Sequence, residues 1–292
     1  MTVAGFTFIR NAIKFDYPVV EAIKSILPLC DYVVVAVGNS EDDTLNLVKN
    51  IDPHKIRIIE TIWDDSLREG GEVLAIETNK AFDAIPTDAD WCFYIQGDEV
   101  LHEMYYPEIK NALEKWKSDP DTEGLLFKYR HFYGSYDYIG TARGWYRHEI
   151  RIIKNNKAIR SYRDAQGFRK NNKKLKVRLL NAFMHHYGWV RPPEKQQLKQ
   201  LNFNRLWHTD AEIRDKIPEV DEFDYSNTDA VDLFNGTHPA VMQERINQLN
   251  WTFSFDPTQR PLPFKEKISR FIEKWAGRRI GEYKNYVNIG DA

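Results

Sequence analysis

The chain has few cysteines and no long hydrophobic run. Its 292 residues include only two cysteines, Cys30 and Cys92, each in or beside an apolar stretch. Two thiols so placed provide neither a disulfide framework nor the paired spacing of a zinc site. No stretch reaches the ~20 apolar residues of a membrane span, and the N-terminus lacks the basic and apolar segments of a signal peptide. We therefore expect a cytoplasmic protein with two buried thiols.

An excess of one charge sign and the common glycine motifs for nucleotides are also missing. Lys and Arg number 41 against 43 Asp and Glu, which gives a net charge of -2. This balance produces no basic field, so the sequence predicts no nucleic-acid partner. No GxGxxG opens the first predicted helix, and no lysine-bearing phosphate loop is present. Dinucleotide-binding and P-loop proteins are therefore excluded.

Apolar segments alternate with amphipathic ones along the first hundred residues. Four apolar segments are typical of buried strands: residues 5–9, 32–37, 55–60 and 91–95. Between them, apolar residues recur at helical spacing, as Val19, Ile23 and Ile26 do. This alternation predicts βαβ units, and hence a mainly parallel sheet with helices on its faces. Further strands are expected at residues 124–129 and 149–153.

The apolar strand at 91–95 leads directly into Gln96, Gly97, Asp98 and Glu99. A strand that is apolar at every position is buried on both faces. Open α/β sheets bind their ligands beyond the carboxyl ends of such strands, where these two carboxylates lie. Two interpretations stay open. The acids bind a divalent cation and, through it, a phosphate, or they cap a following helix and stabilise its dipole.

Two later segments have a distinctive composition. Residues 130–138 are dense in aromatic side chains. Such a loop suits a binding lid, with packing on an apolar surface as the alternative. Residues 194–207 are mostly polar with three leucines, which predicts a helix on the surface.

These segments together resemble a family 2 glycosyltransferase of the GT-A fold. The similarity covers roughly residues 3 to 190 and is closest to a bacterial subgroup with a later His-Tyr-Gly-Trp, here residues 186–189. The residues that carry it are Asn39-Ser40-Glu41-Asp42-Asp43-Thr44, Arg68-Glu69-Gly70-Gly71 with Asn79, and Gln96-Gly97-Asp98-Glu99. The resemblance implies an α/β GT-A domain over 1–190, with a Rossmann-like, mainly parallel mixed sheet flanked by helices. A mainly helical C-terminal extension packed on this domain is expected over 191–292.

The resemblance also implies a site for a nucleotide-sugar donor. Its expected donor-binding residues are Asn39, Asp42, Arg68, Asn79, Gln96 and Asp98. Structural roles stay open for several of them: helix capping for Asn39 and Asp42, and a surface ion pair for Arg68. The sequence departs from the family pattern at Gln96, which replaces the first acid of the Asp-x-Asp metal motif.

A metal site is implied by the same resemblance. Asp98 and His186 are the expected ligands, holding Mn²⁺ or Mg²⁺ against the diphosphate of the donor. His185 and His186 would point to opposite faces of an extended segment, so only one of them can serve. A hydrogen-bonded core histidine is the alternative for His186.

For the chemistry, the resemblance places the catalytic base of an inverting enzyme at Asp164, with Glu99 as a second catalytic acid. Glu149 is the runner-up base, and a turn or cap residue is the structural alternative for Asp164. General bases of this kind remove the proton of the acceptor hydroxyl while the sugar is held for in-line attack.

The expected function is glycosyl transfer from a nucleotide sugar, in assembly of bacterial capsule, lipopolysaccharide or exopolysaccharide. The acceptor is expected to be a saccharide or a lipid-linked saccharide. The alternative is a non-catalytic carbohydrate- or partner-binding module on a degenerate GT-A scaffold. Residues 265–284 form an amphipathic basic segment that either rests on the anionic inner membrane surface or docks on its own domain.

Overall fold

The computed structural model describes residues 1–216, 220–226, 228, 230–256, 275 and 282–292. Four parallel strands form one half of a mixed sheet, in the spatial order β3-β2-β1-β4. They are β1 (Val3–Ile9), β2 (Tyr32–Gly38), β3 (Ile56–Thr61) and β4 (Trp91–Tyr94). The helices between them are α1 (Val19–Ile26), α2 (Thr44–Lys49) and α3 (Glu72–Asp83), with a 3-10 turn at Leu27–Leu29. The predicted βαβ series is confirmed.

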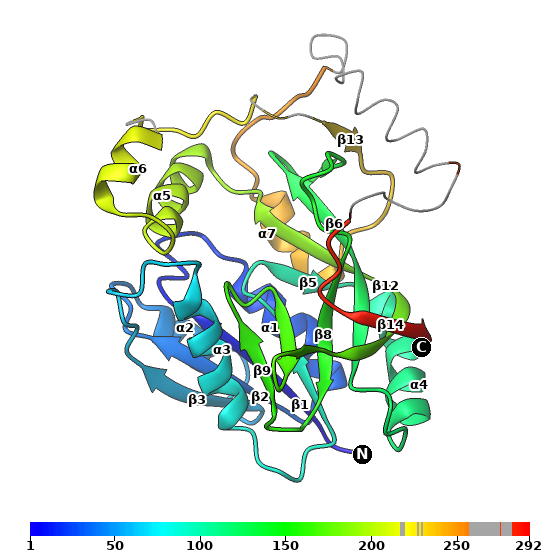
Figure 1. Ribbon diagram of the computed structural model, residues 1–292. Coiled ribbons are helices and arrows are strands. Elements are labelled where there is room, and N and C mark those ends of the chain that lie inside the picture. The colour runs from blue at the N-terminus through cyan, green and yellow to red at the C-terminus, as the bar shows by residue number, and fades with distance from the viewer. Residues whose placement is uncertain (217–219, 227, 229, 257–274, 276–281) are drawn as a thin grey trace.

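The other half of the sheet is mostly antiparallel and continues from β4 (Figure 1). Strand β8 lies between β4 and β6 and runs antiparallel to both. The long strand β12 runs parallel to β6 and also pairs with β5 and β14. These strands are β5 (Glu99–Leu101), β6 (Gly124–Tyr133), β7 (Tyr138–Gly140), β8 (His148–Lys154), β12 (Lys176–Trp189), β13 (Val231–Leu233) and β14 (Val287–Asp291). A separate small sheet contains β9 (Ile159–Tyr162), β10 (Gly167–Lys170) and β11 (Lys173–Lys174).

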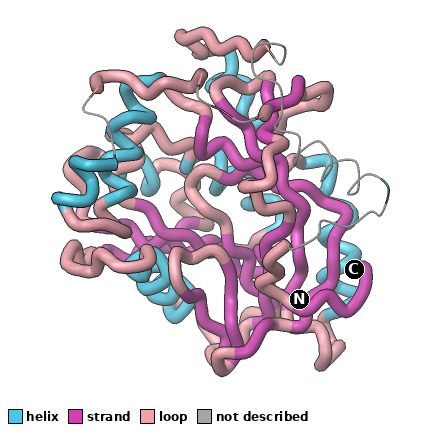
Figure 2. Tube along the Cα trace, turned by 45° about the horizontal axis from the view of Figure 1, so that its top comes forward, coloured by secondary structure: helices cyan, strands magenta, loops and turns pink. Residues whose placement is uncertain are grey.

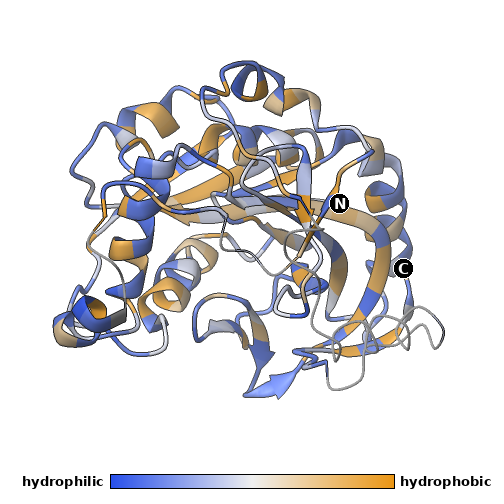
Figure 3. Cartoon of the chain, turned by 90° about the horizontal axis from the view of Figure 1, so that it is seen from above, coloured by the Kyte–Doolittle hydropathy of each residue, from blue (hydrophilic) through white to orange (hydrophobic). Residues whose placement is uncertain are grey.

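Apolar side chains fill both faces of the parallel half. Every residue of β2 is buried, as a strand covered by helices on both sides requires. On one face, Phe93 joins the cluster that contains the apolar side of α1. On the other, Phe6 and Tyr94 pack with Phe82 of α3. The strands consequently lie as an apolar layer between helices (Figures 2 and 3). The expected α/β architecture, a sheet flanked by helices, is confirmed.

The residues after Asp98 form a strand rather than a helix. Glu99 begins β5, which pairs with β12 through Glu99 and His186. The next helical elements start only at Glu103–Tyr105 and α4 (Tyr106–Trp116). The interpretation of Asp98 and Glu99 as helix caps is therefore wrong, because no helix starts at these residues.

The aromatic segment 130–138 is not a lid. Its first four residues extend β6, and a turn through Gly134 leads into β7. Phe132, Tyr133 and Tyr136 are buried in two apolar clusters beside β12. The alternative, packing on an apolar surface, describes this segment.

The chain beyond β12 returns to the same sheet. It contains α5 (Pro193–Asn204), α6 (Asp210–Lys216), a 3-10 turn at Ala240–Met242 and α7 (Gln243–Asn247). Strand β13 pairs with β7, and β14 pairs with β12. Helix α5 was expected on the surface, yet Gln196 and Gln197 are buried. One side of α5 therefore packs against the rest of the protein.

Two features of the sequence bear on membrane contact. Within the described ranges, no helix combines the length and apolar content needed to cross a bilayer. Most of the predicted amphipathic segment, residues 265–274 and 276–281, lies outside the described residues.

Candidate active site

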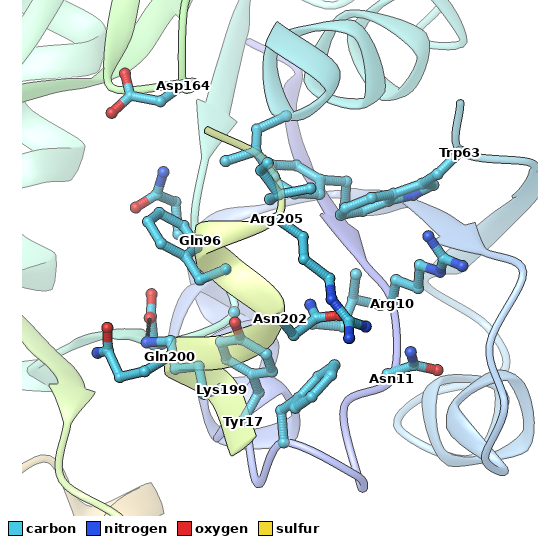
Figure 4. Close-up of a pocket in the computed structure, with 18 of the residues that line it drawn as sticks. Arg10, Asn11, Tyr17, Trp63, Gln96, Asp164, Lys199, Gln200, Asn202 and Arg205 are labelled. Carbon is cyan, nitrogen blue, oxygen red and sulfur yellow. Dashed lines mark hydrogen bonds and ion pairs between the residues drawn. The ribbon is translucent and has the colours of Figure 1, made fainter. Parts of the chain in front are cut away.

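A pocket of about 670 Å³ lies beyond the carboxyl ends of β1 and β4. Five of the predicted site residues line it: Arg68, Gln96, Asp98, Asp164 and His186. They come from four separate parts of the chain: the loop before α3, the turn after β4, the turn between β9 and β10, and the strand β12. In Figure 4, Asp164 and Gln96 lie on one side and Arg10 and Trp63 on the other, with side chains of α5 between them.

Asp98 lies between two basic side chains at the floor of this pocket. Its Oδ1 is 3.8 Å from Nε2 of His186, and its Oδ2 is 3.3 Å from Nζ of Lys199. Burial raises the pKa of Asp98, but the neighbouring side chains of Lys199, His186 and Arg191 outweigh burial and lower it to about 2. Asp98 is therefore an ionised carboxylate.

His186 faces the pocket from β12, whereas His185 points to the opposite side. The Nδ1 atoms of His186 and His131 are 3.0 Å apart, which leaves Nε2 of His186 directed toward Asp98. His185 contacts Arg130 and Tyr187 in the interior. The prediction that the two histidines face opposite ways is confirmed. Burial lowers the pKa of both histidines, so the imidazoles are neutral near pH 7.

Lys199 is a member of the site that the sequence did not indicate. It extends from α5 with only 12% of its side chain exposed, and its Nζ donates to the carbonyl oxygen of Gly188 at 2.8 Å. Behind it, the fully buried guanidinium of Arg191 donates to the carbonyls of Phe15 and Gly188. Burial lowers the pKa of Lys199 to about 7, and an anion bound beside Nζ would raise it again.

Gly188 keeps the corner between Asp98 and His186 open. A Cβ atom there would lie 2.6 Å from Cε1 and Nε2 of His186 and 2.9 Å from Oδ2 of Asp98. Any larger residue would therefore fill the space that the two ligand candidates face.

Glu99 does not line the pocket, although it is the neighbour of Asp98. It is fully buried and receives two hydrogen bonds from Arg151, at 2.7 and 2.8 Å. The hydroxyl of Tyr129 and the amide of Gln96 also donate to it. A carboxylate with all these donors holds the turn at Gln96 in place and has no access to an acceptor.

Asp164 lies in the turn between β9 and β10, on the far wall of the pocket. Two residues of this turn, Arg163 and Ala165, have positive φ angles of 56° and 60°. Gly71 packs against it, because a Cβ on Gly71 would lie 2.9 Å from the Cβ of Asp164. Burial raises the pKa of Asp164, which makes its carboxylate a stronger base.

Glu149, the runner-up base, lies in the interior on β8. It is 4% exposed and is not among the residues that line the pocket. Burial raises its pKa to about 8, with Arg151 opposing and Glu99 and Asp164 adding to the shift. It is therefore a protonated carboxyl at neutral pH.

Arg68 and Arg10 bring further positive charge to the pocket. Arg68 donates to the carbonyl of Arg205 at 2.9 Å and to Asp210 at 2.7 Å, which ties the loop before α3 to the segment after α5. Arg10 pairs with Asp65 and lies 5.6 Å from the ring centroid of Trp63. A flat indole beside a guanidinium offers a surface on which a nucleobase can stack.

Three predicted donor-binding residues make local structural contacts instead and do not line the pocket. Asn39 accepts from the amide of Trp63 at 3.1 Å. Asp42 accepts from the amides of Lys14 and Thr44, at 2.6 and 3.1 Å. Asn79 exchanges two hydrogen bonds with the backbone of Ser161 and so fixes β9 against α3. These side chains shape the loops around the pocket.

The residues at the floor provide two donors for a divalent cation. Asp98 and His186 are positioned for this role, and diphosphate and water would have to complete the coordination sphere. Over the part of the chain that the structure describes, no three His, Cys, Asp or Glu side chains gather around one point. The ammonium of Lys199 already pairs with the same carboxylate.

No family model matches the sequence, and no curated protein matches it either. Among solved structures, S. aureus TarS 1-349 is 12% identical, covering 69% of this chain and 64% of that chain with a TM-score of 0.41. A 4-diphosphocytidyl-2C-methyl-D-erythritol synthase from Anaerococcus prevotii is 11% identical over 53% of this chain and 71% of that chain, with a TM-score of 0.33. Glucosyl-3-phosphoglycerate synthase from Mycobacterium tuberculosis, in complex with Mn²⁺, UDP and phosphoglyceric acid, is 19% identical. It covers 44% of this chain and 43% of that chain, with a TM-score of 0.29.

The chain thus spans about two thirds or less of the length of the TarS structures. With TM-scores below 0.5, these likenesses do not assign a function.

Proposed function

We propose that the chain is a glycosyltransferase that moves a sugar from a nucleotide-sugar donor to an acceptor hydroxyl. The observation that carries the proposal is the meeting of Arg68, Gln96, Asp98, Asp164 and His186 in one pocket. These residues are the ones that the glycosyltransferase resemblance singles out, and they are far apart in the sequence. Their convergence is what a shared site requires and what independent surface residues would not produce.

The donor is proposed to lie along the pocket from Trp63 to Asp98. Its nucleobase stacks beside Trp63 and Arg10, where an indole and a guanidinium are adjacent. Its diphosphate lies at the floor, where the amine of Lys199 and the imidazole of His186 lie beside Asp98. Two groups are candidates to neutralise the leaving diphosphate: a divalent cation that Asp98 and His186 would hold, and the ammonium of Lys199.

The acceptor is proposed to enter on the side of Asp164. Its hydroxyl oxygen attacks the anomeric carbon of the donor sugar and forms the new C–O bond. The bond from that carbon to the diphosphate oxygen breaks, and its electron pair leaves with the nucleoside diphosphate. Asp164 takes the hydroxyl proton, and attack opposite the leaving group inverts the anomeric configuration.

The wider role follows from the resemblance. We extend the proposal to assembly of a bacterial capsule, lipopolysaccharide or exopolysaccharide, with a saccharide or lipid-linked saccharide as acceptor. The protein is proposed to act in the cytoplasm and to contact the inner membrane surface peripherally.

The experiment is a thermal-shift titration of the full chain with UDP, GDP, CDP and dTDP, with and without Mn²⁺. Ligand at 100 times its Kd stabilises a folded protein by about 2.7 kcal/mol. We therefore expect at least one of the four to raise the Tm by several degrees. If none of them does so under either condition, the proposal is overturned.

A matched pair of glycine variants shows whether this pocket is responsible. Gly188→Ala places a methyl group between His186 and Asp98, whereas Gly144 has no atom within 4 Å of its would-be Cβ. We expect Gly188→Ala to lose the nucleotide-induced shift and Gly144→Ala to keep it, each measured against its own ligand-free Tm.

A further inference from the structure

The floor of the pocket has two basic side chains, Lys199 and Arg191, beside one carboxylate, Asp98. Within the described residues, Lys199 and Arg191 both lie close to Asp98. Asp98 is the acidic partner of Lys199, and Arg191 is bonded to carbonyl oxygens rather than to an acid. Two cations thus share one carboxylate, which suits an anionic ligand.

Lys199 is held in a fixed position rather than lying loose on the surface. Its Nζ donates to the carbonyl of Gly188 at 2.8 Å and to Oδ2 of Asp98 at 3.3 Å. An ammonium has three N–H donors, so these two bonds leave one for a group in the pocket that Lys199 lines. Two hydrogen bonds hold the end of α5, the helix that carries Lys199, at the pocket. Gly71 N–H donates to the carbonyl of Leu206, and Arg68 donates to the carbonyl of Arg205, both just beyond α5.

The ammonium lies where a metal ion would also be needed. A metal ligated by Asp98 and His186 would share its carboxylate with Lys199, and two cations on one carboxylate repel each other. The sequence points the same way, since Gln96 replaces the first acid of the metal motif. A neutral amide at that position removes a charge that would help to hold a dication.

We propose that Lys199, supported by Arg191, neutralises the diphosphate of the donor and that the site therefore works without a divalent cation. This inference rests on the proposed function, because it assigns a role to Lys199 in the same site. Lys199 donates to the diphosphate oxygens from α5, and Asp98 orients the ammonium toward them. Asp98 is then a positioning residue for Lys199 rather than a metal ligand.

The test measures nucleoside diphosphate affinity by calorimetry on the full chain, in EDTA and in Mn²⁺. The wild-type protein is expected to bind equally well in both, within a factor of two. Lys199→Met is expected to lose at least tenfold in affinity in EDTA, and Lys199→Arg to retain most of it. Lys195→Met is the matched control on the same helix, because Lys195 bonds to the carbonyl of Lys14 and does not line the pocket.

Three other outcomes are distinguishable. Wild-type binding that needs Mn²⁺, together with unchanged affinity in Lys199→Met, overturns the inference and leaves the proposed function standing. Recovery of Lys199→Met by Mn²⁺ supports it, since removing the ammonium frees Asp98 and His186 for the metal. Absence of binding for all four nucleotides under both conditions overturns the proposed function and this inference with it.

Discussion

Asp98 and Glu99 are consecutive carboxylates that belong to two different regions of the molecule. Asp98 faces the pocket, with Lys199 and His186 within 4 Å. Glu99 faces the interior, where Arg151 and Tyr129 occupy its oxygens. One region leaves charge available to a ligand, and the other satisfies its charge internally.

The difference shows that the side chains around a carboxylate decide its role, whereas its position in a sequence motif does not. The Glu99–Arg151 pair is completely buried, so removing one member would leave the other as an unpaired charge in the core. Beside Asp98, by contrast, Gly188 has no side chain, which leaves the space between Asp98 and His186 open. Substitutions in the pocket should therefore change the rate of transfer or the binding of ligand. Substitutions of Glu99 and its buried partners should change the stability of the fold.

The largest effect is expected at Asp164, the proposed base. Asp164→Asn should reduce transfer by about 10²- to 10⁴-fold, the range that general-base catalysis contributes. Nucleotide affinity should stay within a few-fold, because Asp164 lies on the acceptor side. The measurement is kcat with the donor and acceptor identified by screening, next to calorimetric affinity for the nucleoside diphosphate.

Glu149→Gln is the matched substitution in the interior region. Since Glu149 does not line the pocket, its conversion to the amide should leave kcat within a few-fold at pH 6.5. If Glu149→Gln abolishes transfer and Asp164→Asn does not, the assignment of the base is reversed.

The second effect concerns stability. Glu99→Gln should destabilise the fold by roughly 3–5 kcal/mol, because Arg151 then stays buried without a counter-charge. The comparison is Asp83→Asn, which breaks an ion pair with Arg160 whose side chains are 51% and 40% exposed. That variant should cost about 0–1 kcal/mol. Chemical denaturation measures both, and equal losses would contradict the contrast between the two regions.

The smallest effect, taken per pH unit, is a pH dependence of stability that comes from Glu149. Burial raises the pKa of Glu149 to about 8 in the folded chain, above the ordinary glutamate value of 4.5. Between these two values the unfolded chain loses the proton that the folded chain keeps, so stability falls as pH rises. In the wild-type protein the unfolding free energy should fall by up to about 1.4 kcal/mol per pH unit between pH 5 and 8, and Glu149→Gln should flatten the resulting decline in Tm. A wild-type Tm that is constant or rises over this range would contradict the assignment.

Much of the parallel half could be predicted from sequence alone. Strands β2 and β4 are continuously apolar, and α1 carries apolar residues at helical spacing. Such local patterns fix the element types, and the end of β4 fixes the position of Asp98. The opposite directions of His185 and His186 follow from strand geometry in the same way.

The packing of helix α5 over the pocket could not be predicted, because its sequence does not show which side of the helix is buried. Helix α5 buries Gln196 and Gln197 while Leu198 is 36% exposed, the reverse of an amphipathic pattern. Lys199 and Asp98 are 101 residues apart, and no local signal joins them. Asn39, Asp42 and Asn79 were assigned to the donor because turn-forming and ligand-binding side chains have the same chemistry.

The most direct measurement is a structure of the full chain with the nucleoside diphosphate that gives the largest thermal shift. We expect the diphosphate to lie at the floor beside Lys199 and Asp98, and the nucleobase to lie beside Trp63 and Arg10. A nucleotide bound elsewhere, with the floor around Asp98 free of phosphate, would contradict it.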